Sequence, residues 1–180
     1  MKKNKYFFID AECDGLNGAF ISVAMIVTNE KFNEIERKYI GICKDKLIVN
    51  DKWTRENVVP YMGEYYGVSS ECELLEEVWH FWRKYADEAY AVGDVIFPVE
   101  ARLFQKCINR DITNRNLQGP FPLLDLSSLI FAKRMNPLIP REQIISSDRI
   151  ITGKRHNALY DVEIMIENFK YLMGGTKVGR

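Results

Sequence analysis

The stretch Phe7-Phe8-Ile9-Asp10-Ala11-Glu12-Cys13-Asp14-Gly15-Leu16 joins a hydrophobic run to two carboxylates and a turn. The apolar run from Tyr6 to Ile9 predicts a short buried strand. Because residues i and i+2 of a strand point to the same face, Asp10 and Glu12 should face one spot at the strand end, where open sheets bind ligands. Two acids on one face repel each other unless a cation lies between them, so this pattern predicts a site for a hard divalent cation. The alternative is an exposed acidic turn, and the buried run before Asp10 argues against it.

A second stretch, His156-Asn157-Ala158-Leu159-Tyr160-Asp161, supplies a histidine and another carboxylate at a predicted helix start. Residues with this spacing lie about 140° apart on a helix, so His156 and Asp161 would not share one face. If His156 precedes the helix, it can swing over the site while Asp161 reaches the site from the second turn. An unperturbed histidine is mostly neutral at about pH 7 to 8, as a general base must be. The alternative for His156 is an ordinary surface position.

The middle of the chain offers two further acids, Asp94 and Glu100. Asp94 follows a predicted strand at 89–93, and Glu100 lies in the first turn of a predicted helix at 98–109. The helix dipole favours an acid in a first turn, so an ordinary helix-start charge is the alternative for Glu100. Carboxylates that hold paired cations, with a histidine to take a proton from water, are what phosphodiester hydrolysis requires. The acids and the histidine therefore predict a nuclease.

The totals fit one globular domain that spans residues 1–180. Lys plus Arg is 25 and Asp plus Glu is 25, so the formal net charge is zero. A protein that wraps a long duplex would need a strongly basic face, and the charge argues against that class. It does not argue against an enzyme that grips a strand end, because bound metal ions would supply local positive charge there.

Cysteine usage and hydropathy predict a cytoplasmic protein that does not span a membrane. The start, Met1-Lys2-Lys3-Asn4-Lys5, leads straight into a strand-like run and does not have the form of a signal peptide. No apolar stretch approaches ~20 residues. The cysteines form no CxxC pair, which argues against a zinc site and favours reduced thiols. They are Cys13, Cys43, Cys72 and Cys107.

Hydrophobic patterning predicts an α/β fold, in which a mixed sheet is flanked by helices. Three strands come first, and the turns between them favour an antiparallel meander. Residues 44–69 predict loops with a short helix, and residues 134–153 a Pro- and Ser-containing connection. The predicted strands cover 6–9, 20–28, 35–43, 89–93 and 123–124, and the predicted helices cover 71–86, 98–109, 126–132 and 157–172.

The two terminal stretches together resemble the DEDD superfamily of 3′-to-5′ exonucleases, in its histidine-containing (DEDDh) branch, which includes ribonuclease T and oligoribonuclease. The first motif of that branch is a strand ending in Asp-x-Glu, and its third motif is His-x-Ala-x-x-Asp. The matching residues are Asp10, Glu12, Gly15 and Leu16 in the first motif and His156, Ala158 and Asp161 in the third. The resemblance covers nearly the whole chain.

The second motif departs from the family pattern. It is usually Asn-x-x-Phe-Asp-x-x-Phe-Leu, with the aspartate opening a helix, whereas here Phe97 is followed by Pro98. Glu100 has the family's spacing to the apolar pair that follows it, and Asp94 occupies the place of the asparagine. Either acid could therefore serve, and the helix register favours Glu100. Asp125 resembles an element often found between motifs two and three, and we interpret it as a helix cap or a supporting residue.

The resemblance implies a ribonuclease-H-like fold and a metal-dependent exonuclease that releases nucleoside 5′-monophosphates from the 3′ ends of single strands. The residues implied for two Mg²⁺ or Mn²⁺ ions are Asp10, Glu12, Asp161, Glu100 and Asp94. His156 would be the general base. Backbone N–H groups around Asp14, Gly15 and Leu16 would meet the terminal sugar, and Leu16 would wedge against the last base.

Two questions stay open at this stage. A catalytically impaired module of the same fold, which binds nucleic-acid ends or a protein partner, is the alternative that the altered second motif favours. The sequence does not choose between RNA and DNA, because no residue announces a contact with the 2′-hydroxyl. Members of the family are often homodimers, so a homodimer is one implied state, but no residue identifies an interface.

Overall fold

Strand β1 (Lys5–Cys13) lies in the interior of a mixed sheet. The computed structural model describes residues 3–145 and 153–174, and these form a six-stranded sheet in the order β4-β3-β2-β1-β5-β6. Central β1 is almost entirely apolar up to Ile9, which suits a strand that is covered on both faces.

The strands pair in two ways on either side of β1. β2 (Phe20–Asn29) and β3 (Glu34–Ile42) follow as antiparallel neighbours, which confirms the predicted meander. β5 (Ala89–Gly93) is parallel to β1, and β6 (Leu123–Asp125) is parallel to β5. β4 (Tyr66–Val68) is parallel to β3 at the other edge. The parallel strands carry their carboxyl ends to the same edge of the sheet as the end of β1.

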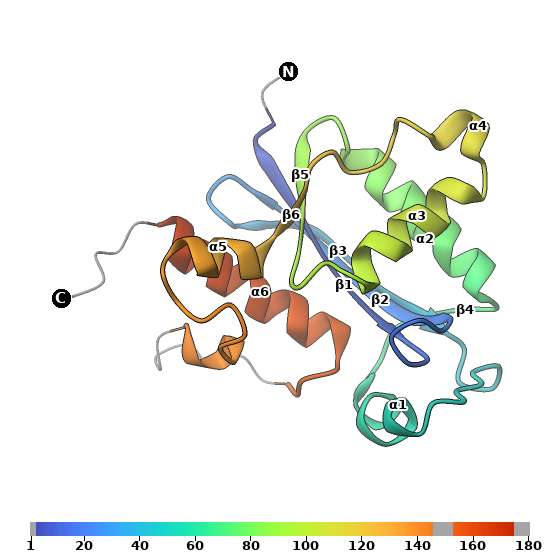
Figure 1. Ribbon diagram of the computed structural model, residues 1–180. Helices are drawn as coiled ribbons and strands as arrows, with labels where there is room; N and C mark the ends of the chain where they lie inside the picture. Colours follow the sequence, from blue (N-terminus) through green and yellow to red (C-terminus); the bar gives the residue numbers. More distant parts are fainter. Residues whose placement is uncertain (1–2, 146–152, 175–180) are drawn as a thin grey trace.

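Helices cover both faces of the sheet, as Figure 1 shows. α2 and α3 lie against one face, and α5 and α6 lie against the other. The predicted α/β arrangement is therefore confirmed. The helices are α1 (Lys52–Asn57), α2 (Glu71–Tyr85), α3 (Val99–Asn109), α4 (Ile112–Arg115), α5 (Leu126–Ala132) and α6 (Ala158–Met173), with 3-10 turns η1 (Val59–Tyr61) and η2 (Arg141–Gln143).

Alternation along β1 divides the core into two layers. Phe7 and Ile9 belong to the cluster that includes α2 and α3, whereas Phe8 belongs to the cluster that includes α5 and α6. Successive side chains of a strand point to opposite faces, so Asp10 and Glu12 continue the row of Phe8. Both acids are thereby directed toward the layer that contains α6.

Capping side chains explain where the predicted helices begin. Ser70 accepts a hydrogen bond from the N–H of Glu73 at the start of α2. Asp125 accepts from Ser127 and Ser128 at the start of α5, as expected for a cap, and Asn157 caps α6 in the same way. Each of these side chains satisfies an N–H group that the first turn of a helix leaves unpaired.

Two predicted segments differ from the structure. β1 extends to Cys13 rather than ending at Ile9, because pairing with β2 continues through Glu12 and, after a shift in register, to Cys13. Within 44–69 the short helix α1 is present, but so is β4, whose three residues are too few to show a periodic pattern. Residues 146–152 of the predicted 134–153 connection lie outside the described residues.

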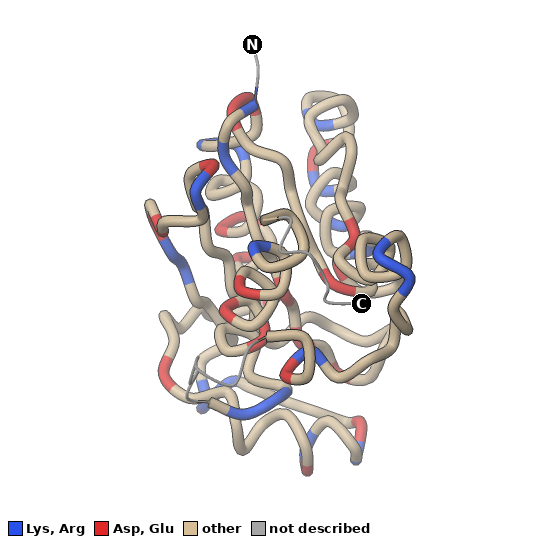
Figure 2. The backbone as a smooth tube through the Cα atoms, turned by 90° about the vertical axis from the view of Figure 1, so that its left-hand side faces the viewer, with Lys and Arg blue, Asp and Glu red and all other residues tan. Residues whose placement is uncertain are grey.

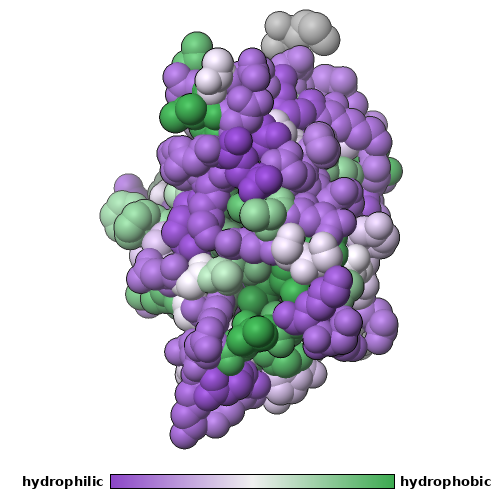
Figure 3. Space-filling model, turned by 90° about the vertical axis from the view of Figure 1, so that its right-hand side faces the viewer, coloured by the Kyte–Doolittle hydropathy of each residue, from purple (hydrophilic) through white to green (hydrophobic). Residues whose placement is uncertain are grey.

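Charge and hydropathy vary over the surface. Figure 2 shows basic and acidic positions interspersed along the backbone, in keeping with the equal totals of 25. Figure 3 shows a largely hydrophilic face whose largest group of hydrophobic residues lies in its lower half. Among residues 3–145 and 153–174, no helix combines the length and the apolar character needed to cross a bilayer.

Candidate active site

Three carboxylates from the two ends of the chain meet at one edge of the sheet. Asp10 and Glu12 come from β1 and Asp161 comes from α6, and one oxygen of each lies within 4.8 Å of the others. Alternation along β1 turns both of its acids toward α6, so side chains that are distant in sequence converge. The structure thus brings together three residues predicted for a metal site. Asp161 lies in the first turn of its helix rather than the second.

Burial and mutual repulsion oppose the ionisation of these acids. Burial raises the pKa of Asp10 well above its usual range, and the charges of Asp161 and Glu12 raise it further. The pKa of Glu12 rises to about 8, through burial first and Asp161 second. Burial also raises the pKa of Asp161 to about 7. Bare carboxylates so close together are unfavourable, so the group will hold either protons or a cation near neutral pH.

His156 lies just before α6, with Asn157 as the N-cap between them. The backbone N–H of His156 donates to Oδ2 of Asp161 at 2.8 Å, which fixes the histidine beside the carboxylates despite the spacing along the chain. His156 and Val95 both line the cavity that the carboxylates also line. The backbone φ of His156 is 68°, and that of Val95 is 51°. Such values are strained for residues other than glycine and tend to occur at functional sites.

The imidazole of His156 packs against Trp53 of α1. The ring centroids are 4.9 Å apart and the planes meet at 84°, an edge-to-face arrangement. The imidazole makes no hydrogen bond with any residue that the structure describes. Burial, and then the charge of Arg155, lower the pKa of His156 below its ordinary value. The ring is therefore neutral near neutral pH and has a free nitrogen to accept a proton.

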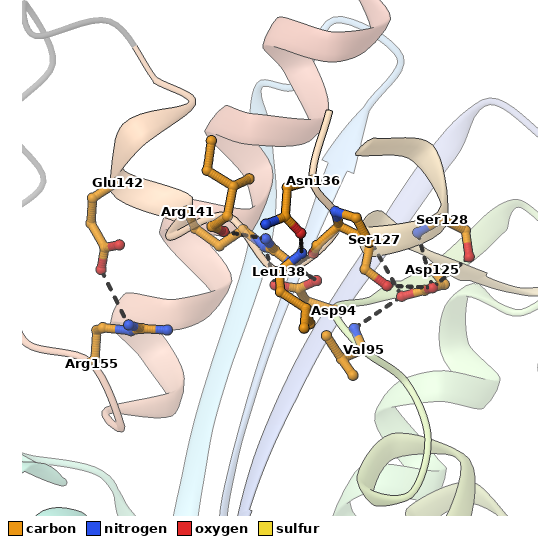
Figure 4. A network of polar contacts seen from close by, with 12 residues as sticks. Asp94, Val95, Asp125, Ser127, Ser128, Asn136, Leu138, Arg141, Glu142 and Arg155 are labelled. Atoms are coloured by element: carbon orange, nitrogen blue, oxygen red, sulfur yellow. Dashed lines mark hydrogen bonds and ion pairs between the residues drawn. The ribbon is translucent and has the colours of Figure 1, made fainter. Parts of the chain in front are cut away.

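Asp94 and Glu100, the two candidates for the second acid, have different surroundings. Both oxygens of Asp94 accept hydrogen bonds from Arg141, at 2.5 Å from Nε and 2.8 Å from Nη2 (Figure 4). Glu100 is only 3% exposed and lines the same cavity without an ion-pair partner among the described residues. Burial raises the pKa of Glu100 to about 8, although hydrogen bonds from its own N–H and that of Ala11 act in the opposite direction. Neither acid belongs to the group of three within 4.8 Å.

The turn after β1 is fastened to α1. The carboxylate of Asp14 accepts the N–H of Asp51 at 2.7 Å, and the N–H of Gly15 donates to Oγ1 of Thr54 at 3.0 Å. Gly15 has a φ of 67°, which glycine adopts without strain. The N–H of Asp14 donates to the carbonyl oxygen of Ala19 at 2.9 Å, so the N–H groups of Asp14 and Gly15 that were predicted to meet a substrate are already used within the protein. Leu16 is 66% exposed at the tip of the turn and remains free to do so.

Two adjoining cavities share this edge. The carboxylates line one of about 290 Å³, together with Asp94 and Glu100, and Trp53 and Val58 line a second, more apolar one of about 370 Å³. The residues common to both are Ala11, Glu12, Leu16, Val99 and His156. The charged space therefore opens directly into an apolar one.

The sequence analysis did not identify Arg141 or Arg155, which also line the charged cavity. Arg141 lies in the connection at 134–153 and pairs with Asp94 over a long sequence separation, so no local pattern could have found it. Arg155 offered one signal, because a basic residue stands directly before the candidate general base.

Comparisons with known proteins give the fold of the chain. No protein-family model matches the sequence, and no curated protein matches it. Solved structures of exonuclease I match the structure of this chain. The zinc-bound complex of E. coli exonuclease I with single-stranded DNA is 14% identical, with a TM-score of 0.67 over 98% of this chain and 42% of that chain.

Two further exonuclease I structures agree with this result. One has a TM-score of 0.67 and 14% identity, and the enzyme of Methylocaldum szegediense has a TM-score of 0.62 and 12% identity. This chain covers 41% of the length of each of them. The described chain therefore has the ribonuclease-H-like α/β fold of these exonucleases.

Proposed function

We propose that this chain is a metal-dependent 3′-to-5′ exonuclease that hydrolyses phosphodiester bonds at the 3′ ends of single strands. The observation that carries the proposal is the convergence of Asp10, Glu12 and Asp161 within 4.8 Å, beside His156. The exonuclease I neighbours, which have the same fold at 14% identity, support a nuclease. The cytoplasm remains the proposed location.

The donor set fits hard divalent cations. All the ligand atoms offered are carboxylate oxygens, which Mg²⁺ and Mn²⁺ prefer, and soft thiolates are not part of the group. Asp10, Glu12 and Asp161 would hold one ion, and Asp10 and Glu100 a second. When bound, two such ions would neutralise charge on the scissile phosphate and lower the pKa of the attacking water.

His156 acts in this proposal as the general base. Its neutral imidazole accepts a proton from the attacking water as the new P–O bond forms and the bond from phosphorus to the 3′ oxygen of the preceding nucleotide breaks. The products are a nucleoside 5′-monophosphate and a strand shortened by one nucleotide. The hydrogen bond from the backbone N–H of His156 to Asp161, and the contact of the imidazole with Trp53, keep the ring beside the carboxylates.

The apolar cavity is suited to the terminal nucleotide. A phosphate placed at the carboxylates would leave the adjoining sugar and base near Leu16 and Trp53. Exposed leucine and tryptophan side chains can contact the face of any base, so this arrangement favours strand ends without strong sequence preference. RNA and DNA are both candidate substrates under this proposal, and a homodimer is one candidate assembly.

A ladder experiment tests the proposed function. Single-stranded RNA and DNA labelled at the 5′ end should shorten stepwise in Mn²⁺, and the reaction should stop in EDTA. A 3′-phosphate should slow it. Cleavage of circular substrate, or full activity in EDTA, would contradict the proposal.

A binding module that has lost catalysis is the second candidate. The pairing of Asp94 with Arg141 favours it, because it withdraws one candidate metal ligand. Metal-dependent binding of strand ends without any shortening would support this candidate over the exonuclease.

Metal binding should change the pH dependence of stability. Glu12 and Asp161 have folded pKa values of about 8 and about 7, above their ordinary values. The folded state therefore binds more protons than the unfolded state between about pH 5 and 8, so metal-free stability should fall as pH rises through this range. Mn²⁺ would replace the protons.

Melting in EDTA and in Mn²⁺ checks this prediction. Saturation at about 100 times Kd gives about 2.7 kcal/mol, or about 5–10 °C in Tm for a chain of this size. The gain should be larger at about pH 8 than at about pH 6. A metal-free Tm that rises over this range would contradict the assignment of the carboxylate group.

Glu100 rather than Asp94 should be the acid on the metal side. Glu100→Gln should lower turnover by more than about 10²-fold, whereas Asp94→Asn should lower it about tenfold, at the low end of the range for residues that only support a ligand. Asp94 already has both oxygens bound by Arg141, and Glu100 has no such partner among the described residues. Each change is nearly isosteric, so rates can be compared directly. Retained activity in Glu100→Gln with loss in Asp94→Asn would reverse the assignment.

A further inference from the structure

Two arginines line the cavity at the carboxylates, and they differ in how many hydrogen bonds and ion pairs they make within the protein. Arg141 is 12% exposed, and besides Asp94 it donates to the carbonyl oxygens of Pro137 and Ile139. Nearly all of its donors are therefore used within the protein. Arg141 fixes the segment before η2 against the end of β5, and it has little capacity left for a ligand.

Arg155 is held much more weakly. Its side chain is 59% exposed, and its ion-pair partner among the described residues is Glu142, with 3.8 Å between Nε of Arg155 and Oε1 of Glu142. The charge of Arg155 also acts on Asp161, whose pKa it lowers. Figure 4 shows the pair of Arg155 and Glu142 apart from the pair of Arg141 and Asp94. An exposed ion pair of this kind contributes about 0–1 kcal/mol, so Arg155 can exchange its partner at little cost.

The location of Arg155 suits an anionic ligand. It directly precedes His156 and lines the cavity that Asp10, Glu12 and Asp161 also line. A strand whose scissile phosphate lies at the carboxylates carries its next backbone phosphate on the 5′ side of the penultimate nucleotide. Planar guanidinium groups bind phosphate oxygens with paired hydrogen bonds.

We propose that Arg155 releases Glu142 and binds a backbone phosphate of the strand, and that Glu142 competes with the substrate for this arginine. The inference rests on the proposed function, since it takes a nucleic-acid strand as the ligand. Arg155 thereby contributes to affinity for the strand, and Glu142 limits it.

Equilibrium binding of a fluorescent single-stranded oligonucleotide in Ca²⁺, at several salt concentrations, tests the proposal. Ca²⁺ occupies oxygen ligands and keeps the site charged while the strand is titrated. Arg155→Gln should weaken binding about tenfold, the worth of one charge-assisted hydrogen bond. The slope of log affinity against log salt should fall by about 0.7, as for one lost contact to a single strand.

Two further variants make the result specific. Glu142→Gln should strengthen binding about two- to fivefold, and this gain should vanish in the double variant with Arg155→Gln. Lys31→Gln is the control of equal charge change, because Lys31 lies in the turn between β2 and β3, at the other end of the sheet.

The outcomes separate this inference from the proposed function. If Arg155→Gln and Lys31→Gln bind the strand with the same affinity and the same salt slope, the role of Arg155 is overturned. Stepwise shortening of the strand by the wild type would still uphold the exonuclease in that case. Wild type that neither binds nor shortens the strand would overturn both. Wild type that binds through Arg155 but does not shorten the strand would leave the inference standing and overturn the proposed catalysis.

Discussion

Replacing Asp10 with asparagine is expected to lower turnover by about 10³-fold or more, because a lost metal ligand removes several kcal/mol of transition-state stabilisation. Asp10 lies at the centre of the group, since Asp161, Glu12, Glu100 and Asp94 all raise its pKa after burial does. The amide is nearly isosteric and keeps the position in β1, but it cannot supply the anionic oxygen. Initial rates in Mn²⁺ measure the loss.

The same change should stabilise the metal-free protein. Without metal, Asp10 must either keep a buried charge or take up a proton on folding, and both cost free energy at about pH 8, so Asp10→Asn should melt higher than the wild type in EDTA at that pH and lose most of the response to Mn²⁺. Asp111→Asn is a matched control, because Asp111 caps α4 and asparagine caps equally well. Wild-type turnover in Asp10→Asn would show that the carboxylates are not the catalytic centre.

Replacing His156 with alanine should lower turnover by about 10²–10⁴-fold, the usual worth of a positioned acid–base group. The Mn²⁺-dependent gain in Tm should persist, because the carboxylates remain. Burial, then Arg155, lower the pKa of His156, so wild-type turnover should fall only at a pH below the ordinary histidine range. A pH–rate profile of the wild type and a rate for the variant check both statements.

His80→Ala is the control for this prediction. The chain has 2 histidines, and His80 is exposed on α2, away from the carboxylates. The His80→Ala variant should have the same turnover as the wild type. Undiminished turnover in His156→Ala would leave His156 as an ordinary surface residue and would require another acceptor for the proton.

The local sequence pattern was sufficient to predict the position of a residue where that position depends only on its neighbours along the chain. Strand parity placed Asp10 and Glu12 on one face, and the predicted helix at 157–172 placed His156 just before the last helix. The mixed sheet followed from three strands and then alternating elements. These features depend on short-range geometry, which periodicity reports directly.

Long-range pairing explains what the sequence could not predict. The bond between Arg141 and Asp94 joins residues that no local pattern relates, and it decides which acid is free to serve the site. The contact of Trp53 with His156 likewise depends on how α1 is fastened to the turn after β1. β4 forms by pairing with β3, and its three residues are too few to show a strand pattern in the sequence.

Anomalous scattering from a crystal soaked with Mn²⁺ tests the central claim most directly, because it locates the ion without reference to activity. The account predicts a strong peak bounded by carboxylate oxygens of Asp10, Glu12 and Asp161, and its loss in Asp10→Asn under the same soak. A soaked wild-type crystal without a peak at these residues, or with an equal peak in Asp10→Asn, would contradict the account.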